Sequence, residues 1–196
     1  MPLYGYAVLP ERPDENIGCR QDIVFVAGFG HPPNIDGAIW FAKEILPRIR
    51  ARHPSVKLYL AGSNPTDEIK AMNSDNIIVT GFLSEEDLAK LYRMARVVVA
   101  PLRFGGGVKG KIVEAMWYGV PCVTTSVGLQ GLDSAKEFSF YSDEPSSFAD
   151  AVSLLLEDDE EWHRVSLSGQ SFIKDSFMES AQWAAFAPEL DKSGID

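Results

Sequence analysis

The sequence predicts an α/β fold built on a doubly wound parallel sheet of about six strands, with helices on both faces. Six short apolar segments recur along the chain, as expected for strands that a parallel sheet buries on both sides. Segments with the periodicity of amphipathic helices lie between them. The 196 residues, 45% hydrophobic and 23% charged, have the length and composition of about one globular domain.

The predicted strands share their short length and their enrichment in Val, Ile and Phe. They span residues 23–27, 56–61, 76–80, 96–100, 120–124 and 137–141, of which the fourth is the most apolar and the sixth the weakest. Right-handed crossovers favour the Rossmann-like order 3-2-1-4-5-6. That order places a ligand crevice at the carboxyl ends of strands one and four, and so points to the loops at residues 28–34 and 101–108.

The predicted helices follow from apolar stripes and from their end signals. The first contains Pro47, where we expect a kink, and Pro54 ends it. The second begins at the capping signal Ser84-x-x-Asp87, and the third ends at Gly119. The helices span residues 38–53, 84–95, 108–118, 146–156, 159–172 and 176–190.

Charge and cysteine content exclude several classes of protein. The 18 Lys and Arg against 28 Asp and Glu leave a net charge of −10, which disfavours nucleic acid as a partner. Two cysteines make neither a disulfide framework nor a metal motif. No apolar run approaches the ~18 residues of a membrane helix, and the first residues do not resemble a signal peptide. We therefore expect a cytoplasmic protein that uses no metal.

Three consecutive glycines, Gly105, Gly106 and Gly107, follow the most apolar strand and precede a helix. Glycines let backbone N–H groups approach a ligand closely, and a helix start adds free donors and a positive dipole end. Lys109 and Lys111 bring two cations to the same place. On an acidic chain this pattern predicts a phosphate or diphosphate site, the alternative being a flexible turn with two solvated lysines.

Two better-known phosphate motifs do not match. Gly105-x4-Gly110-Lys111 lacks the Ser or Thr of a P-loop, because Ile112 stands there. The loop that begins at Gly28 has Pro33 where a dinucleotide fingerprint needs its third glycine. A P-loop nucleotidase and a nicotinamide dehydrogenase are both disfavoured.

Glu114 lies three residues after Lys111, on the same face of the predicted helix. It either forms a surface pair with that lysine or accepts hydrogen bonds from sugar hydroxyls, and the residues alone leave both open.

Residues 105–121, from the three glycines through Lys109, Lys111 and Glu114 to Pro121, resemble the donor-binding signature of group 1 (family 4) glycosyltransferases. The later loop at residues 124–132 is similar to the one that follows it in the family, and weaker likeness extends over residues 20–175. The resemblance implies one half of a two-domain GT-B enzyme, the carboxyl-terminal half that binds a nucleotide-sugar donor. The amino-terminal, acceptor-binding half would be a separate, missing domain, and any peripheral membrane contact would belong to it.

The resemblance also implies roles for individual residues. Lys109 and Lys111 would neutralise the leaving diphosphate in a retaining, metal-independent transfer without a cofactor, and Glu114 would hold the ribose hydroxyls. Main-chain amides would bind the phosphates and further residues would flank the base; these donor-binding residues are Gly28, Phe29, Gly30, His31, Gly81, Phe82, Leu83, Gly105, Gly106 and Gly107. Family members often carry a second glutamate eight positions before the first, where this chain has Gly106.

The resemblance predicts three regions: an extended lead-in (residues 1–20), the donor-binding domain (21–175), and a closing helix and tail (176–196) that would pack toward the missing half. Such a half is expected to bind the donor without turning it over. A nucleotide-sugar epimerase of similar fold and a non-catalytic nucleotide-binding or scaffolding module are the alternatives.

Overall fold

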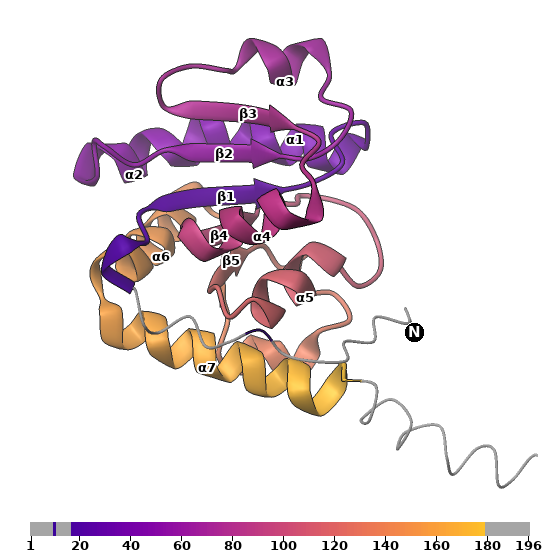
Figure 1. Ribbon diagram of the computed structural model, residues 1–196, viewed down its shortest axis with the longest axis vertical. Coiled ribbons are helices and arrows are strands. Elements are labelled where there is room, and N and C mark those ends of the chain that lie inside the picture. Colours follow the sequence, from indigo (N-terminus) through magenta and orange to yellow (C-terminus); the bar gives the residue numbers. More distant parts are fainter. Residues whose placement is uncertain (1–9, 11–16, 179–196) are drawn as a thin grey trace, which may run out of the picture.

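The computed structural model describes residue 10 and residues 17–178. Over these residues the chain forms one six-stranded sheet in the order β3-β2-β1-β4-β5-β6, with every neighbouring pair parallel (Figure 1). The predicted fold class and strand order are therefore confirmed. Most of the predicted lead-in, and almost all of the predicted closing helix and tail, lie outside the described residues. The last part of the lead-in is not extended as predicted, because residues 17–19 form a 3-10 turn.

The strands agree with the apolar segments, apart from the last. They are β1 (Asp22–Val26), β2 (Leu58–Ala61), β3 (Ile77–Gly81), β4 (Ala95–Ala100), β5 (Cys122–Thr124) and β6 (Phe140–Tyr141). All six residues of β4 are buried, as its sequence predicts. The predicted strand over residues 137–141 was too long, because residues 133–137 form a 3-10 helix (η3, Asp133–Glu137) that buries Ala135. Only Phe140 and Tyr141 remain to pair with β5.

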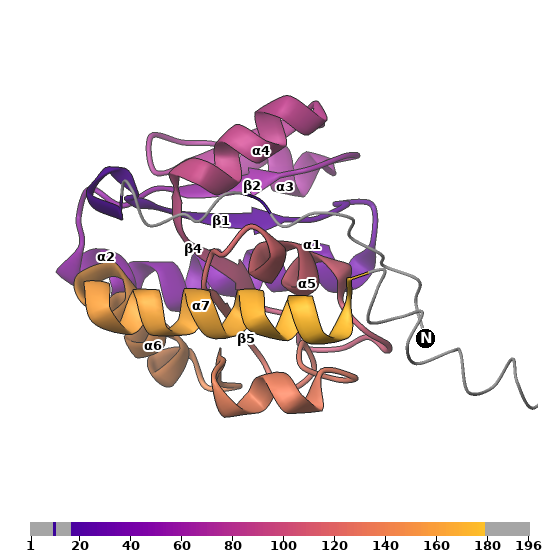
Figure 2. The same cartoon turned by 60° about the horizontal axis from the view of Figure 1, so that its bottom comes forward.

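Helices cover both faces of the sheet. One layer holds α1 (Pro32–Trp40), the π-helix η2 (Phe41–Ile45), α2 (Leu46–Arg52), α3 (Asp67–Ala71) and α6 (Pro145–Glu157). The opposite layer holds α4 (Glu85–Met94) and α5 (Gly110–Trp117). The long helix α7 (Asp159–Ser176) lies beside α5 and α6 (Figure 2). Two apolar clusters, one on each face, form the core.

The first helical segment starts earlier than predicted and contains a π-helical turn just before Pro47. It begins at Pro32, six residues early, because Pro32 and Pro33 occupy the first turn, where a missing N–H costs nothing. The helical segment continues through Pro47 to Arg52. In the π-helical turn before it, the Leu46 N–H donates to the Phe41 carbonyl five residues back.

Side-chain caps hold the starts of α3 and α4. The Asp87 N–H donates to Ser84 Oγ at 3.1 Å, as its sequence signal predicts. The short helix α3 was not predicted; Thr66 caps it by accepting from the Ile69 N–H. The Ser84 cap fixes the first turn of α4, and Leu88 of this helix lines the cavity described below.

Candidate functional site

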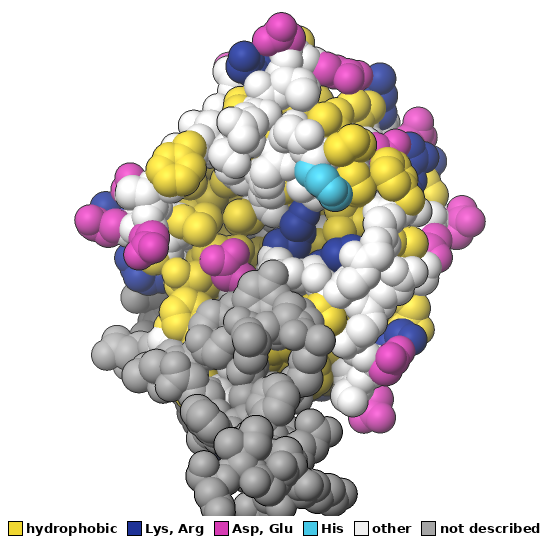
Figure 3. Space-filling view, turned by 90° about the vertical axis from the view of Figure 1, so that its right-hand side faces the viewer, with side chains coloured by type: hydrophobic (Ala, Val, Ile, Leu, Met, Phe, Trp, Pro, Cys, Tyr) yellow, Lys and Arg dark blue, Asp and Glu magenta, His cyan; other side chains and the backbone are white. Residues whose placement is uncertain are grey.

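A cavity of about 330 Å³ lies at the carboxyl ends of β1, β2 and β3, next to α5. Its lining residues are Val26, Ala27, Gly28, Ala61, Gly62, Ser63, Phe82, Leu83, Leu88, Lys111 and Glu114. Figure 3 shows this edge of the molecule, where basic side chains lie in a hollow between apolar ones. The cavity is therefore apolar on the β3 and α4 side and charged on the α5 side, at the crevice that the strand order predicts.

The floor of the cavity depends on Gly62. The Ala27 N–H donates to the Ala61 carbonyl at 2.9 Å, and the Gly62 N–H donates to the Gly81 carbonyl at 3.0 Å. Gly62 has a φ of 147°, and a Cβ there would lie 1.9 Å from the Ala27 carbonyl oxygen. Only glycine allows the ends of β1 and β2 to lie this close.

The loop after β1 contributes backbone atoms, rather than side chains, to the cavity. Gly28 lines the cavity, whereas the Phe29 side chain is fully buried, edge-on to Phe25 with ring centroids 5.7 Å apart. Gly30 and His31 are exposed. His31 is the N-cap residue of α1, but its side chain makes no capping hydrogen bond.

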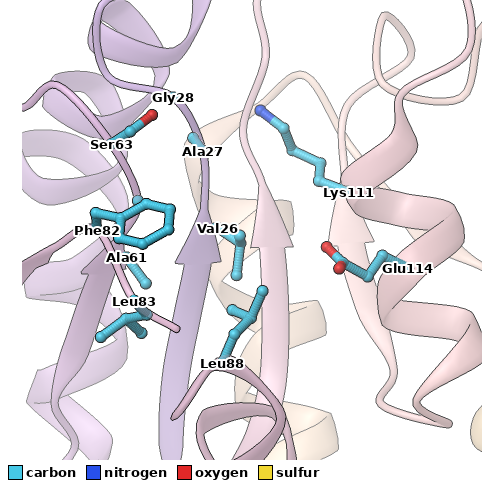
Figure 4. Close-up of a pocket in the computed structure, with 11 residues that line it drawn as sticks. Val26, Ala27, Gly28, Ala61, Ser63, Phe82, Leu83, Leu88, Lys111 and Glu114 are labelled. Carbon is cyan, nitrogen blue, oxygen red and sulfur yellow. The ribbon is translucent and has the colours of Figure 1, made fainter. Parts of the chain in front are cut away.

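Lys111 extends from α5 toward the end of β1 (Figure 4). Its ammonium donates a hydrogen bond to Asn34 Oδ1 and lies 4.9 Å from the centroid of the Phe25 ring. Burial lowers the pKa of Lys111 to about 8. A cation that is partly stripped of water and lacks a carboxylate partner among the described residues is well suited to receive an anion.

Asn34 is a residue that the sequence reasoning missed. Its Nδ2 donates to the Gly28 carbonyl at 2.8 Å while its Oδ1 accepts from Lys111, so one side chain joins the β1 loop to α5. Its place in the predicted crevice loop was the only available signal, because the lysine is 77 residues away in the sequence.

Glu114 lies one turn after Lys111, and its carboxylate lies beside the cavity (Figure 4). Its Oε2 accepts a hydrogen bond from the Tyr92 hydroxyl at 2.9 Å. Burial raises the pKa of Glu114, and the hydrogen bond from Tyr92 opposes that rise. The salt bridges of the described residues do not include a Lys111–Glu114 pair, so the surface-pair interpretation is not supported.

The three-glycine loop is exposed and bends back at Gly105 and Gly107, whose φ values are 117° and 74°. Lys109 Nζ donates to the Gly107 carbonyl at 2.6 Å and to the Gly105 carbonyl at 3.4 Å, so this lysine faces its own loop. Burial lowers the pKa of Lys109. Lys111 lines the cavity and Lys109 does not. Gly106, where the resemblance implies a glutamate in other members, has nothing within 4 Å of the position that a Cβ would take.

The segment after β3 forms the apolar wall. Gly81 ends the strand with a φ of 70°, and the Phe82 side chain that follows is 80% exposed. Leu83 is half-buried against the cavity. Leu88 of α4 completes this wall and was not among the predicted site residues.

Among the described residues, no group of three or more His, Cys, Asp and Glu side chains is arranged to hold a metal ion. Within the same residues, no helix combines the length and apolar character that crossing a bilayer requires.

Comparison with known sequences gives a family match over most of the chain. The model for "Glycosyl transferases group 1" matches residues 20–158. An uncharacterized 44.6 kDa protein from the cps region of Klebsiella pneumoniae is 29% identical over 119 residues, which is 56% of this chain and 30% of that protein.

Three solved structures of similar fold are considerably longer than this chain. HepE from Anabaena, in complex with UDP and glucose, matches 98% of this chain and 54% of its own at 18% identity, with a TM-score of 0.69. S. aureus TarM, as a variant in complex with UDP and other ligands, matches 91% of this chain and 36% of its own at 16% identity, also with a TM-score of 0.69. Sucrose-phosphate synthase from Thermosynechococcus elongatus matches 96% and 48% at 22% identity, with a TM-score of 0.66. This chain therefore spans about a third to a half of the length of its relatives.

Proposed function

Because the chain belongs to the group 1 glycosyltransferases, we propose that it is the donor-binding half of such an enzyme. In this proposal it holds a nucleotide-diphosphate-sugar at the cavity, and a second domain brings the acceptor. Its matched relatives are two to three times as long, which leaves room for that second domain.

One observation carries the proposal: Lys111 and Glu114 lie one helical turn apart and line the same cavity at the carboxyl edge of the sheet. The cation suits a diphosphate, and the carboxylate suits a pair of vicinal hydroxyls. The apolar wall at Phe82 and Leu83 suits a base. Diphosphate, ribose and base are the three parts of a nucleoside diphosphate, and UDP is present in the HepE and TarM complexes.

The proposed chemistry is glycosyl transfer with retention. The bond between the sugar and the diphosphate breaks, and negative charge develops on the departing phosphate oxygens. Lys111 and the backbone N–H groups of Gly28, Gly30 and the three-glycine loop stabilise that charge, because they are placed before the reaction begins. Lys109 joins them in this proposal only by leaving the Gly105 and Gly107 carbonyls, to which it hydrogen-bonds in the structure. These groups supply the positive charge in this proposal without a metal or a cofactor. Since the acceptor site lies on another domain, this chain alone binds the donor and does not turn it over.

We propose a reducing, cytoplasmic setting for this chemistry. Both cysteines are free, Cys19 at the surface and Cys122 in the core, where burial raises the pKa of the thiol to about 12.

The proposal is tested by thermal unfolding of the chain with UDP, GDP and ADP. A nucleoside diphosphate at about 100 times its Kd is expected to stabilise the fold by about 2.7 kcal/mol, which raises Tm by several degrees. The matching nucleosides without phosphates are the control, and they should give much smaller shifts. Equal shifts with nucleoside and diphosphate, or none with any nucleotide, would contradict a diphosphate site.

A further inference from the structure

We propose that Tyr92 is a positioning residue for the nucleotide ribose, because its hydroxyl holds one oxygen of Glu114 and leaves the other free to accept from the ribose hydroxyls. This inference rests on the function proposed above and adds to it a residue outside the signature on α5.

The two carboxylate oxygens of Glu114 differ in their hydrogen bonding. The Tyr92 hydroxyl donates to Oε2 at 2.9 Å, across from α4. Oε1 accepts no hydrogen bond from any residue in the described part of the chain, although Glu114 lines the cavity. A carboxylate that is anchored through one oxygen loses little freedom when the other oxygen binds a ligand.

The Tyr92 side chain is itself firmly held. It is fully buried, and its ring stacks on Tyr118 with centroids 4.4 Å apart and planes 14° apart. Arg20 Nη1 donates to the Tyr92 carbonyl at 3.0 Å and to the Ala95 carbonyl at 2.9 Å, which fixes the end of α4 against β4. The hydroxyl therefore has one position from which to reach Glu114.

The same hydrogen bond favours the charged form of Glu114. Burial raises the pKa of Glu114, and the Tyr92 hydroxyl lowers it. The Tyr92 phenol stays protonated and able to donate, because burial and the nearby carboxylate raise its pKa well above the usual value. The other titratable groups nearby are Lys111 on α5, Tyr118 just after it, Arg93 and Glu85 on α4, and the buried Cys122 thiol on β5. Among the described residues, none of these side chains hydrogen-bonds to the Glu114 carboxylate.

The test compares Tyr92→Phe with Tyr118→Phe in the 196-residue chain. The probe is whichever of UDP, GDP and ADP binds the unchanged protein most tightly, together with its 2′,3′-dideoxy analogue. The ratio of the two Kd values measures recognition of the ribose hydroxyls. We expect Tyr92→Phe to reduce this ratio by about tenfold, toward one, because an unanchored carboxylate pairs poorly with the hydroxyls. Tyr118→Phe removes a hydroxyl from the stacked partner ring and should leave the ratio unchanged.

A pH series provides a second readout. Without the Tyr92 hydroxyl the pKa of Glu114 rises, so the loss of affinity on acidification should begin at a higher pH in Tyr92→Phe than in the unchanged protein. Protonation of the nucleotide phosphates is common to both proteins and cancels in the comparison. A purely structural role for Tyr92 would weaken ribo and dideoxy nucleotides equally and leave the pH profile in place, and that result would overturn the inference.

Glu114→Gln and the Tyr92→Phe, Glu114→Gln double variant complete a cycle. If Tyr92 acts through Glu114, the second substitution adds nothing to the loss of ribose recognition caused by the first. Should Glu114→Gln remove that recognition while Tyr92→Phe retains it, the inference is wrong and the proposed function stands. Should the unchanged protein bind none of the three nucleotides, the proposed function itself fails.

Discussion

Replacing Lys111 with methionine is expected to weaken the binding of a nucleoside diphosphate by about 10- to 100-fold. The ammonium lies in the cavity, partly desolvated, and among the described residues its hydrogen bond goes to the neutral Asn34 amide. A charge-assisted hydrogen bond to a phosphate in such a place contributes about 1.5–3 kcal/mol. Isothermal titration with the nucleotide that stabilises the chain best would measure the loss.

Two control variants distinguish a specific role of the Lys111 ammonium from the general effect of removing one positive charge from the chain. Lys43→Met makes the same chemical change on an exposed lysine of η2 and should leave the affinity within about twofold. Lys111→Arg keeps the charge and should retain much of the affinity. If Lys43→Met and Lys111→Met weaken binding equally, the ammonium of Lys111 has no specific role.

The pH dependence of binding provides an independent check on the same lysine. The pKa of Lys111 is about 8 in the empty protein, and a bound diphosphate raises it by favouring the charged form. Lys111 should therefore add no pH dependence well below pH 8, and affinity should fall above pH 8 by up to about tenfold per pH unit. Lys111→Arg stays charged through this range, and its affinity should not fall there.

Replacing Gly62 with alanine is expected to destabilise the fold by about 3–5 kcal/mol. Gly62 has a φ of 147°, which side chains rarely adopt, and a Cβ would lie 1.9 Å from the Ala27 carbonyl oxygen. The obstacle is backbone, so a change of rotamer cannot relieve it. The ends of β1 and β2 must separate, and the floor of the cavity separates with them.

Gly81→Ala is the matched control. Gly81 also has a positive φ, at 70°, but a Cβ there meets nothing within 4 Å. Gly81→Ala should lower the free energy of unfolding by only about 1–2 kcal/mol, the usual penalty for an alanine in the left-handed region. Urea unfolding would measure both variants, and equal losses would show that the close approach at Gly62 is not what makes it costly.

The sheet could be predicted from the sequence because a strand that is buried on both faces is a continuous run of apolar residues. Such a run is visible in the sequence without knowledge of the fold. β4, with all six residues buried, is the clearest case. The missed elements lack that signal. Helix α3 is only five residues long, and α1 begins with two prolines, which carry no apolar periodicity that would predict a helix. The sixth strand was overextended because the burial of Ala135 in η3 depends on tertiary packing.

The site could be predicted only in part, for the same reason. Glycines and lysines that lie within ten residues of one another in the sequence predict an anion site. In the structure, Lys111 and Glu114 from this part of the chain do line the same cavity. Asn34 and Tyr92 touch these residues from 77 and 22 positions away, so their roles depend on the folded sheet. The sequence also suggests equal roles for Lys109 and Lys111, whereas Lys109 hydrogen-bonds to its own loop.

The most direct test of the account is to map the backbone amide signals of the chain by nuclear magnetic resonance during titration with UDP, GDP and ADP. The account predicts saturable changes with at least one of them, concentrated at residues 28–30, 81–83 and 105–114 around the cavity. Changes that cluster at the opposite edge of the sheet, or no saturable change with any of the three, would contradict a nucleoside diphosphate site at this edge.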